Sequence, residues 1–497
     1  MKSAIKIYLM LCAVFFSCNS EQVVSLDSLP LVPYPNDIVN QNGSISIASL
    51  ISMSFPKMKN SFKAEILEYW KKELKQPIQL SEEGVLSFAL DENLDSAEAY
   101  SIQIGKDKVS VAAATEEGLY RGWQSLQQIL VFSSSMKVLP MGQIIDSPNY
   151  AYRGAMLDVA RHFFTLEEVK RYIDLLALYK FNYLHLHLTD DQGWRIEIKS
   201  WPRLTEFSSQ SEVGGTPGGY YTQDDYVELV QYAAQKFITI VPEFDVPGHT
   251  NAALHAYAEL NCNGVAPKVH EGIEVGFSSL CIDKPITYQF VEDVIRELAS
   301  LTPGPYIHIG GDETQATPDV QFMKFIDTVI PMVGKYNKTP MGWFEVQKTN
   351  YKGDLLSQYW AKEADKPENV KKGKPIVMSP SSFAYLDMKY DSLSQYGLFW
   401  AGYISVKKAY EWSPRNLVPN LASEDIIGME TPLWSETISD NLGIDYLAFP
   451  RLIGHSEIGW SLESRREWTN YKGRLKQQLS WLKDKGVQAY ESPLLKD

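Results

Sequence analysis

From Tyr150 onward the sequence alternates short apolar segments with amphipathic segments of helical period, and this alternation constrains the fold more than any other feature. The apolar segments predict eight strands, within residues 152–163, 182–194, 238–249, 305–313, 339–345, 354–360, 374–387 and 425–436. Helices are predicted at 165–181, 222–237 and 285–301, and Thr165 and Glu168 form a capping box at the start of the first. Because alternating β–α units build parallel sheets, residues 148–497 are predicted to form a (β/α)8 TIM barrel.

Residues 22–147 have a different pattern and predict a small α+β domain before the barrel. Segments 85–90, 99–105 and 108–114 alternate apolar and polar residues, which is typical of strands with one buried face. Residues 115–130 repeat apolar positions with helical spacing. Nothing in this domain suggests chemistry, so we interpret it as an accessory domain.

Residues 1–17 have the pattern of a signal peptide. Lys2 and Lys6 precede a short apolar run that ends at the small residue Ser17. The run is too short to span a bilayer. Ser17-Cys18 resembles a bacterial lipoprotein processing site, at which Cys18 becomes the lipidated first residue; cleavage without lipidation is the alternative. We therefore expect an exported protein, either a periplasmic or outer-membrane lipoprotein or a secreted protein, whose membrane contact is the lipid anchor alone.

Cys262 and Cys281 are the cysteines left once the leader and a lipidated Cys18 are set aside. In an oxidising compartment an even pair is expected to form a disulfide, and two independent buried thiols are the alternative. The sequence contains no Cys-x-x-Cys motif, so it predicts no zinc ribbon.

Composition narrows the possible partners. The chain of 497 residues is 44% hydrophobic and 22% charged, as in globular proteins, and its formal charge is −14. This acidity, without any basic patch, argues against a nucleic-acid partner. No pattern in the sequence predicts an oligomeric state.

Polar and aromatic residues stand at or just past the end of each predicted barrel strand. They are Arg161, His162, Asp190, Asp191, Glu243, Asp245, His249, Asp312, Glu313, Trp343, Trp360, Tyr385, Asp387, Trp434 and Glu436. The carboxyl ends of the strands form the catalytic face of a TIM barrel, so these side chains are expected to converge there.

Carboxylates among aromatic side chains suggest cleavage of a glycosidic bond. No phosphate-binding glycine loop or nucleophilic serine elbow is present in the required context. In most glycosidases two carboxylates from different strands face each other across the scissile bond. Asp312 and Glu313 are adjacent, and neighbouring side chains of an extended chain diverge. They are therefore not expected to act as the usual nucleophile and acid.

Five motifs resemble those of the β-N-acetylhexosaminidases of glycoside hydrolase family 20: "LDVARHF", "LHLHLTDDQGWR", "EFDVPGH", "HIGGDE" and "LWSE". The resemblance extends from about residue 30 onward and includes the accessory domain. It implies a substrate-assisted reaction, in which the 2-acetamido oxygen of the sugar attacks the anomeric carbon and an oxazolinium-like intermediate forms. The expected substrate is a glycan with a terminal β-linked N-acetylhexosamine, and no cofactor or metal is implied.

The resemblance also implies roles for individual residues. Glu313 would be the general acid and then the base, Asp312 would hold the acetamido N–H, and Tyr385 would bind the acetamido carbonyl. The remaining implied roles are pocket walls and floor for Trp343, Trp360 and Trp434, binding of the outer hydroxyls by Arg161, Asp387 and Glu436, and orientation of the catalytic carboxylates by Asp190 and His249. Closure of the pocket by the outer ligands would make the enzyme exo-acting.

Three alternatives stay open at this point. A disaccharide-releasing member of the same family would need only a longer pocket. His185 and His187 lie on the same side of their strand and could form a metal pair with His249 and Asp312, as in a metal-dependent amidohydrolase. A non-catalytic glycan-binding lipoprotein is the third, although the presence of the catalytic set argues against it.

Overall fold

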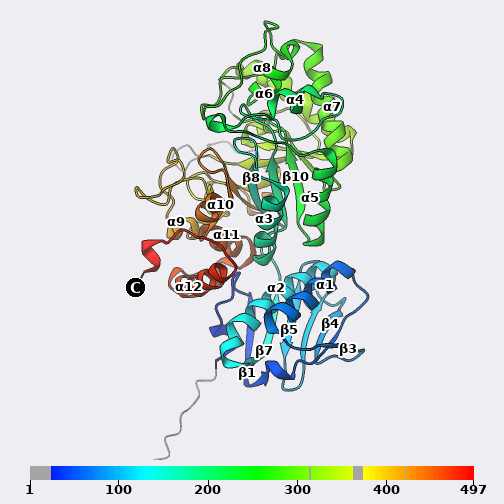
Figure 1. The fold of residues 1–497 in the computed structure, drawn as a ribbon, viewed down its shortest axis with the longest axis vertical. Coiled ribbons are helices and arrows are strands. Elements are labelled where there is room, and N and C mark those ends of the chain that lie inside the picture. Colours follow the sequence, from blue (N-terminus) through cyan, green and yellow to red (C-terminus); the bar gives the residue numbers. More distant parts are fainter. Residues whose placement is uncertain (1–23, 313–314, 362–372, 420, 497) are drawn as a thin grey trace, which may run out of the picture.

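A computed structural model describes residues 24–312, 315–361, 373–419 and 421–496. The predicted signal peptide, Cys18 and Glu313 lie outside these residues. Figure 1 shows two parts: an N-terminal domain, coloured blue to cyan, and a larger part, coloured green to red, that contains the barrel. Within the described ranges, no helix has both the length and the apolar character needed to cross a bilayer.

The larger part is a closed barrel of parallel strands, which confirms the predicted (β/α)8 fold. Its strands are β8 (Tyr152–Asp158), β9 (Tyr183–His187), β10 (Thr239–Glu243), β11 (Tyr306–His308), β12 (Thr339–Trp343), β13 (Leu356–Tyr359), β14 (Ile376–Met378) and β15 (Ile426–Leu433). The barrel closes where β15 pairs with β8. The strands are shorter than the predicted segments, because each segment continues past its strand into the loop that carries polar residues.

Helices surround the barrel. The longer ones are α3 (Leu166–Leu178), α5 (Gln223–Gln235), α7 (Pro285–Leu301), α8 (Asp319–Lys335), α10 (Asn441–Ala448), α11 (Arg451–Trp460) and α12 (Trp468–Asp484). The side chain of Thr165 accepts from the N–H of Glu168 at the start of α3, as the sequence predicts, and Thr222 caps α5 in the same way. The link from β12 to β13 is the 3-10 helix η7 (Phe344–Lys348), so this unit departs from the regular β–α pattern.

The N-terminal domain is built on a seven-stranded sheet with the order β1-β7-β5-β6-β4-β2-β3. Its strands are β1 (Asp37–Ser46), β2 (Ser52–Ser54), β3 (Gln79–Leu80), β4 (Leu86–Leu90), β5 (Tyr100–Ile104), β6 (Val109–Ala113) and β7 (Val138–Asp146), and its helices are α1 (Asn60–Tyr69) and α2 (Glu116–Ser133). The sequence predicted β4, β5, β6 and α2.

The accessory domain covers the amino-terminal end of the barrel. From α2, the buried Arg121 donates hydrogen bonds to the carbonyls of Phe181 and Phe237, shortly before β9 and β10 begin. Glu98 accepts from Arg121 at 2.8 Å and also pairs with Arg153 at the start of β8. The accessory domain therefore closes the amino-terminal end of the barrel with paired charges. Since the strands are parallel, their carboxyl ends lie together at the opposite end, away from the accessory domain.

The first described residues contribute to the same junction. Val32 hydrogen-bonds with Gln128 of α2 through its N–H and its carbonyl. From α12, Gln478 donates to the carbonyl of Pro30. Pro30 and Val32 therefore lie between the accessory domain and the C-terminal helix.

Candidate active site

A cavity of about 550 Å³ lies at the carboxyl end of the barrel strands. The predicted site residues in its lining are Arg161, His249, Asp312, Trp343, Trp360, Tyr385, Trp434 and Glu436. Asp190 and Asp387 are buried and do not contribute to the lining. Side chains predicted to converge from seven strand ends thus meet around one space, while Glu313 lies outside the described residues.

Two glycines bring Asp312 to the cavity. Beyond β11, Gly310 and Gly311 have φ angles of +64° and +78°, which favour glycine. A Cβ on Gly310 would lie 1.7 Å from Oδ1 of Asp245, and the same oxygen accepts the Gly311 N–H at 3.0 Å. The chain can therefore turn directly over the Asp245 carboxylate, and the next residue, Asp312, faces the cavity.

A row of charged side chains supports Asp312. His249 places Nε2 3.6 Å from Oδ1 of Asp312, and its Nδ1 is 3.2 Å from Oδ1 of Asp190. Arg161 Nη1 is 2.9 Å from Oδ2 of Asp190. Burial opposes ionisation of Asp190, but Arg161 and His249 hold its pKa well below the ordinary value. Burial likewise disfavours the charged imidazole, yet Asp312 and Asp190 raise the pKa of His249 well above its usual value. The His249 imidazole therefore lies between the carboxylates of Asp190 and Asp312, and its raised pKa favours the charged form beside Asp312.

Aromatic side chains form the walls. The rings of Trp343 and Trp434 lie 5.8 Å apart, and Tyr385 lies 6.4 Å from Trp434. Two of the indoles are held by carboxylates: Trp343 donates its N–H to Glu243 at 2.9 Å, and Trp360 donates to Glu345 at 3.1 Å. Apolar ring faces held in this way suit the apolar face of a sugar and a methyl group.

The outer ligand set contains buried polar atoms without hydrogen-bond partners of ordinary geometry among the described residues. They are Nε of Arg161, both carboxylate oxygens of Asp387 and Oε2 of Glu436. Burial and the neighbouring Glu436 raise the pKa of Asp387 well above its usual value, although the Trp434 N–H favours the charged form. Burial also raises the pKa of Glu436, against the attraction of Arg161. Because unpaired buried polar groups are costly, this set is suited to receive hydroxyl groups from a ligand.

The cavity also contains side chains that the sequence did not single out: Ile273, Val275, Phe344, Glu345, Ala361, Leu398 and Trp400. Burial, opposed by the Trp360 N–H and assisted by the charge of Asp312, raises the pKa of Glu345 to about 7. Glu345 could have been found in the sequence, because it stands at the end of the predicted strand segment 339–345, two residues after Trp343. Trp400 lies in the long segment between β14 and β15, with no periodic pattern, and its ring is 5.9 Å from that of Tyr385.

Cys262 and Cys281 form a disulfide in the structure, as their pairing predicts. The two cysteines are 19 residues apart in the sequence, and the loop between them contains Ile273 and Val275, which line the cavity. Closing a loop of this length stabilises the folded chain by about 3 kcal/mol relative to the reduced form. The covalent bond thus restrains one rim of the cavity.

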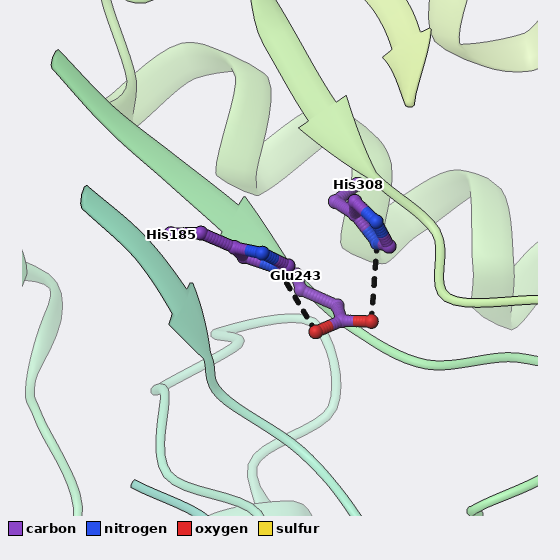
Figure 2. Close-up of side chains that lie close together, drawn as sticks. All are labelled: His185, Glu243 and His308. Atoms are coloured by element: carbon purple, nitrogen blue, oxygen red, sulfur yellow. Dashed lines mark ion pairs between the residues drawn. The ribbon is translucent and has the colours of Figure 1, made fainter. Parts of the chain in front are cut away.

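A buried cluster inside the barrel contains His185, Glu243 and His308 (Figure 2). His185 lies between two carboxylates, with Nδ1 2.9 Å from Glu430 and Nε2 2.9 Å from Glu243. Burial opposes its protonation, but these two carboxylates raise the pKa of His185 to about 9. His308 Nδ1 faces Glu243 at 3.1 Å and the Gly310 N–H at 3.0 Å. The raised pKa of His185 favours its charged form between Glu430 and Glu243, so the cluster fits an ion pair at His185, while burial lowers the pKa of His308 and favours its neutral form.

His187, the other half of the metal pair considered above, faces the barrel interior like His185. Its Nδ1 is 2.5 Å from Glu243 and its Nε2 is 2.8 Å from Asp190. Arg161 Nη1 lies 3.2 Å from the same Nε2. A guanidinium at this distance competes with any cation for the site, so the geometry does not favour the metal set of the amidohydrolase alternative.

Two family models match the chain. "Glycosyl hydrolase family 20, catalytic domain" covers residues 150–463, and "Glycosyl hydrolase family 20, domain 2" covers residues 28–147. These matches bear out the resemblance identified in the sequence motifs.

Individual proteins agree with the family models. A β-N-acetylhexosaminidase from Cellulomonas fimi is 40% identical over 415 residues, covering 82% of this chain and 84% of its own. The structure of the GH20 β-N-acetylhexosaminidase from Streptomyces coelicolor A3(2) has a TM-score of 0.90 and 40% identity, covering 95% of this chain and 99% of that one. The N-acetyl-β-hexosaminidase of Streptomyces plicatus, solved in complex with thio-NAglucal, has a TM-score of 0.90 and 41% identity, with 95% and 98% covered. The chain belongs to glycosyl hydrolase family 20.

Proposed function

We propose that the protein is an exo-acting β-N-acetylhexosaminidase that removes terminal GlcNAc or GalNAc from glycans by substrate-assisted, retaining hydrolysis. The observation that carries the proposal is the position of Asp312, beside His249 and at the edge of a cavity walled by Trp343 and Trp434. A carboxylate so placed can stabilise positive charge on an acetamido group, and the ring faces can enclose its methyl group. The family membership supports the same activity.

The proposed reaction combines the position of Asp312 with the role that the family resemblance implies for Glu313. The acetamido oxygen attacks the anomeric carbon as the glycosidic bond breaks, and the leaving oxygen takes a proton from Glu313. Asp312 accepts the acetamido N–H and stabilises the positive charge of the five-membered ring, while Tyr385 orients the acetamido carbonyl. Water then attacks the anomeric carbon and returns a proton to Glu313, so the acetamido group is restored and the anomeric configuration is retained.

The outer ligand set supports exo action. Among the residues that the structure describes, buried polar atoms of Arg161, Asp387 and Glu436 have no hydrogen-bond partner of ordinary geometry, and sugar hydroxyls would supply these hydrogen bonds. Hydroxyls bound there belong to a ring with no further sugar attached at those positions. The terminal residue of a glycan meets this condition.

Release of nitrophenol from aryl β-glycosides of GlcNAc, GalNAc and glucose tests the proposal. We expect cleavage of the two acetamido sugars, no cleavage of the glucoside, and the same rates after treatment with a chelator. Cleavage of the glucoside at a similar rate would contradict the substrate-assisted reaction. Loss of activity with chelator would favour the amidohydrolase alternative, and an aryl disaccharide as the sole substrate would favour the disaccharide-releasing one.

We also propose that the protein is exported and lipidated at Cys18. The leader pattern of residues 1–17 and the disulfide between Cys262 and Cys281 support this location. Cells grown with a labelled fatty acid should label the wild-type chain and leave the Cys18→Ser variant unlabelled. Label that persists in the variant would contradict the anchor.

A further inference from the structure

Glu243 occupies the centre of the buried polar network. It is the last residue of β10, its side chain is fully buried, and groups from three other strands surround its carboxylate. Oε2 faces His187 at 2.5 Å and His185 at 2.9 Å, both from β9. Oε1 faces His308 of β11 at 3.1 Å and accepts the indole N–H of Trp343, at the end of β12, at 2.9 Å. Figure 2 shows Glu243 between His185 and His308.

Two of these contacts lead to the cavity by different routes. Trp343 is itself part of the cavity wall. His187 continues through its other nitrogen to Asp190 at 2.8 Å, and Asp190 continues through His249 to Asp312. One carboxylate in the barrel core therefore contacts a residue of the cavity wall and is also linked, through His187, Asp190 and His249, to Asp312 in the cavity lining.

We propose that Glu243 is a positioning residue for the reaction, which sets the orientation of Trp343 and maintains the alternating charges of the row from His187 to Asp312. The proposal rests on the proposed function, because Asp312 and Trp343 are its points of action. Glu243 does not line the cavity and acts through its neighbours.

The charge of His187 is the link that depends on Glu243. The charged or titratable groups facing its ring are Glu243 from β10, Asp190 from the loop after β9 and Arg161 from the loop after β8. Burial disfavours the charged imidazole, but Glu243 and Asp190 raise the pKa of His187 well above its ordinary value. Without the charge of Glu243, this pKa falls. His187 then loses its proton at a lower pH, and Asp190 loses one of the cations that hold it.

Glu430 provides a matched control. It is equally buried, and it also faces His185. Its other hydrogen bonds come from Tyr152 and Gln358, which do not line the cavity. A change from Glu to Gln at either position removes one buried charge from the same cluster. Only the change at 243 alters the contacts with Trp343 of the cavity wall and with His187, which leads to Asp312.

The test compares Glu243→Gln with Glu430→Gln on an aryl N-acetylglucosaminide across the pH range, with thermal unfolding of both variants. We expect Glu243→Gln to lower kcat by about 10–10²-fold, as small displacements of catalytic groups do. The alkaline limb of its pH–rate profile should move to lower pH, because His187 loses its proton at a lower pH in this variant. The pH–rate profile of Glu430→Gln should keep both limbs at their wild-type pH, even if the variant is less stable to thermal unfolding.

Trp343→Phe separates the two routes. It removes the indole N–H and leaves the row intact, so it should raise KM without moving the alkaline limb. The positioning role would be overturned if Glu243→Gln kept the wild-type kcat and pH–rate profile while losing as much stability as Glu430→Gln. That result leaves the proposed function standing, whereas an inactive wild-type protein would overturn the function itself.

Discussion

Replacing Asp312 by asparagine will lower kcat on an acetamido glycoside by about 10²–10³-fold, the loss typical of removing one pre-organised electrostatic group. The asparagine keeps the size of the side chain but cannot neutralise the positive charge that develops on the acetamido group. It also loses its attraction to His249, whose Nε2 lies 3.6 Å from the aspartate in the wild-type protein. Steady-state kinetics on the nitrophenyl N-acetylglucosaminide measure the change.

Asp319→Asn is the matched control for this variant. Asp319 lies seven residues further along the chain, at the start of α8, with its side chain 87% exposed beside Lys348. The same loss of charge there should leave kcat unchanged. An Asp312→Asn protein with the kcat of the control would remove the substrate-assisted account, since that account requires charge at this position.

Replacing Glu313 by glutamine will lower kcat by about 10²–10⁴-fold on substrates whose leaving group needs a proton, the range expected for a lost general acid. The loss should shrink for a dinitrophenyl glycoside, because its leaving oxygen departs as a stable anion. The ratio of rates on nitrophenyl and dinitrophenyl substrates therefore reports proton transfer to the leaving group. A variant that loses the same factor on both substrates would contradict the assignment of Glu313 as the acid.

The barrel could be predicted from the sequence because its signals are local. Each barrel strand is an apolar segment, and α3 and α5 have their capping residues at the predicted starts. The accessory sheet was predicted only in part. Residues along β1 are almost all exposed or half-buried, so the strand shows no alternation, and β3 has only two residues. Their pairing in the sheet, rather than their own pattern, makes them strands.

The site could be predicted to the extent that it lies at strand ends. Arg161 and Trp434 follow β8 and β15, and both line the cavity. The role of Asp387 as a ligand of the sugar stays a prediction: its carboxylate is buried and does not line the cavity, but both of its oxygens are without hydrogen-bond partners of ordinary geometry among the described residues. Trp400 has no such landmark in the sequence. The proposed role of Glu243 depends on groups from three other strands, β9, β11 and β12, and the closed barrel brings them together.

The position of the accessory domain has a consequence for the proposed anchoring at Cys18. Pro30 and Val32 lie at the junction that closes the amino-terminal end of the barrel, a few residues after the first described residue, Val24, and the cavity lies at the other end. Any attachment made through the residues before Val24 would hold the molecule by its closed end. A tethered protein would then present its cavity outward, and could meet the free ends of immobile glycans without turning over on its anchor.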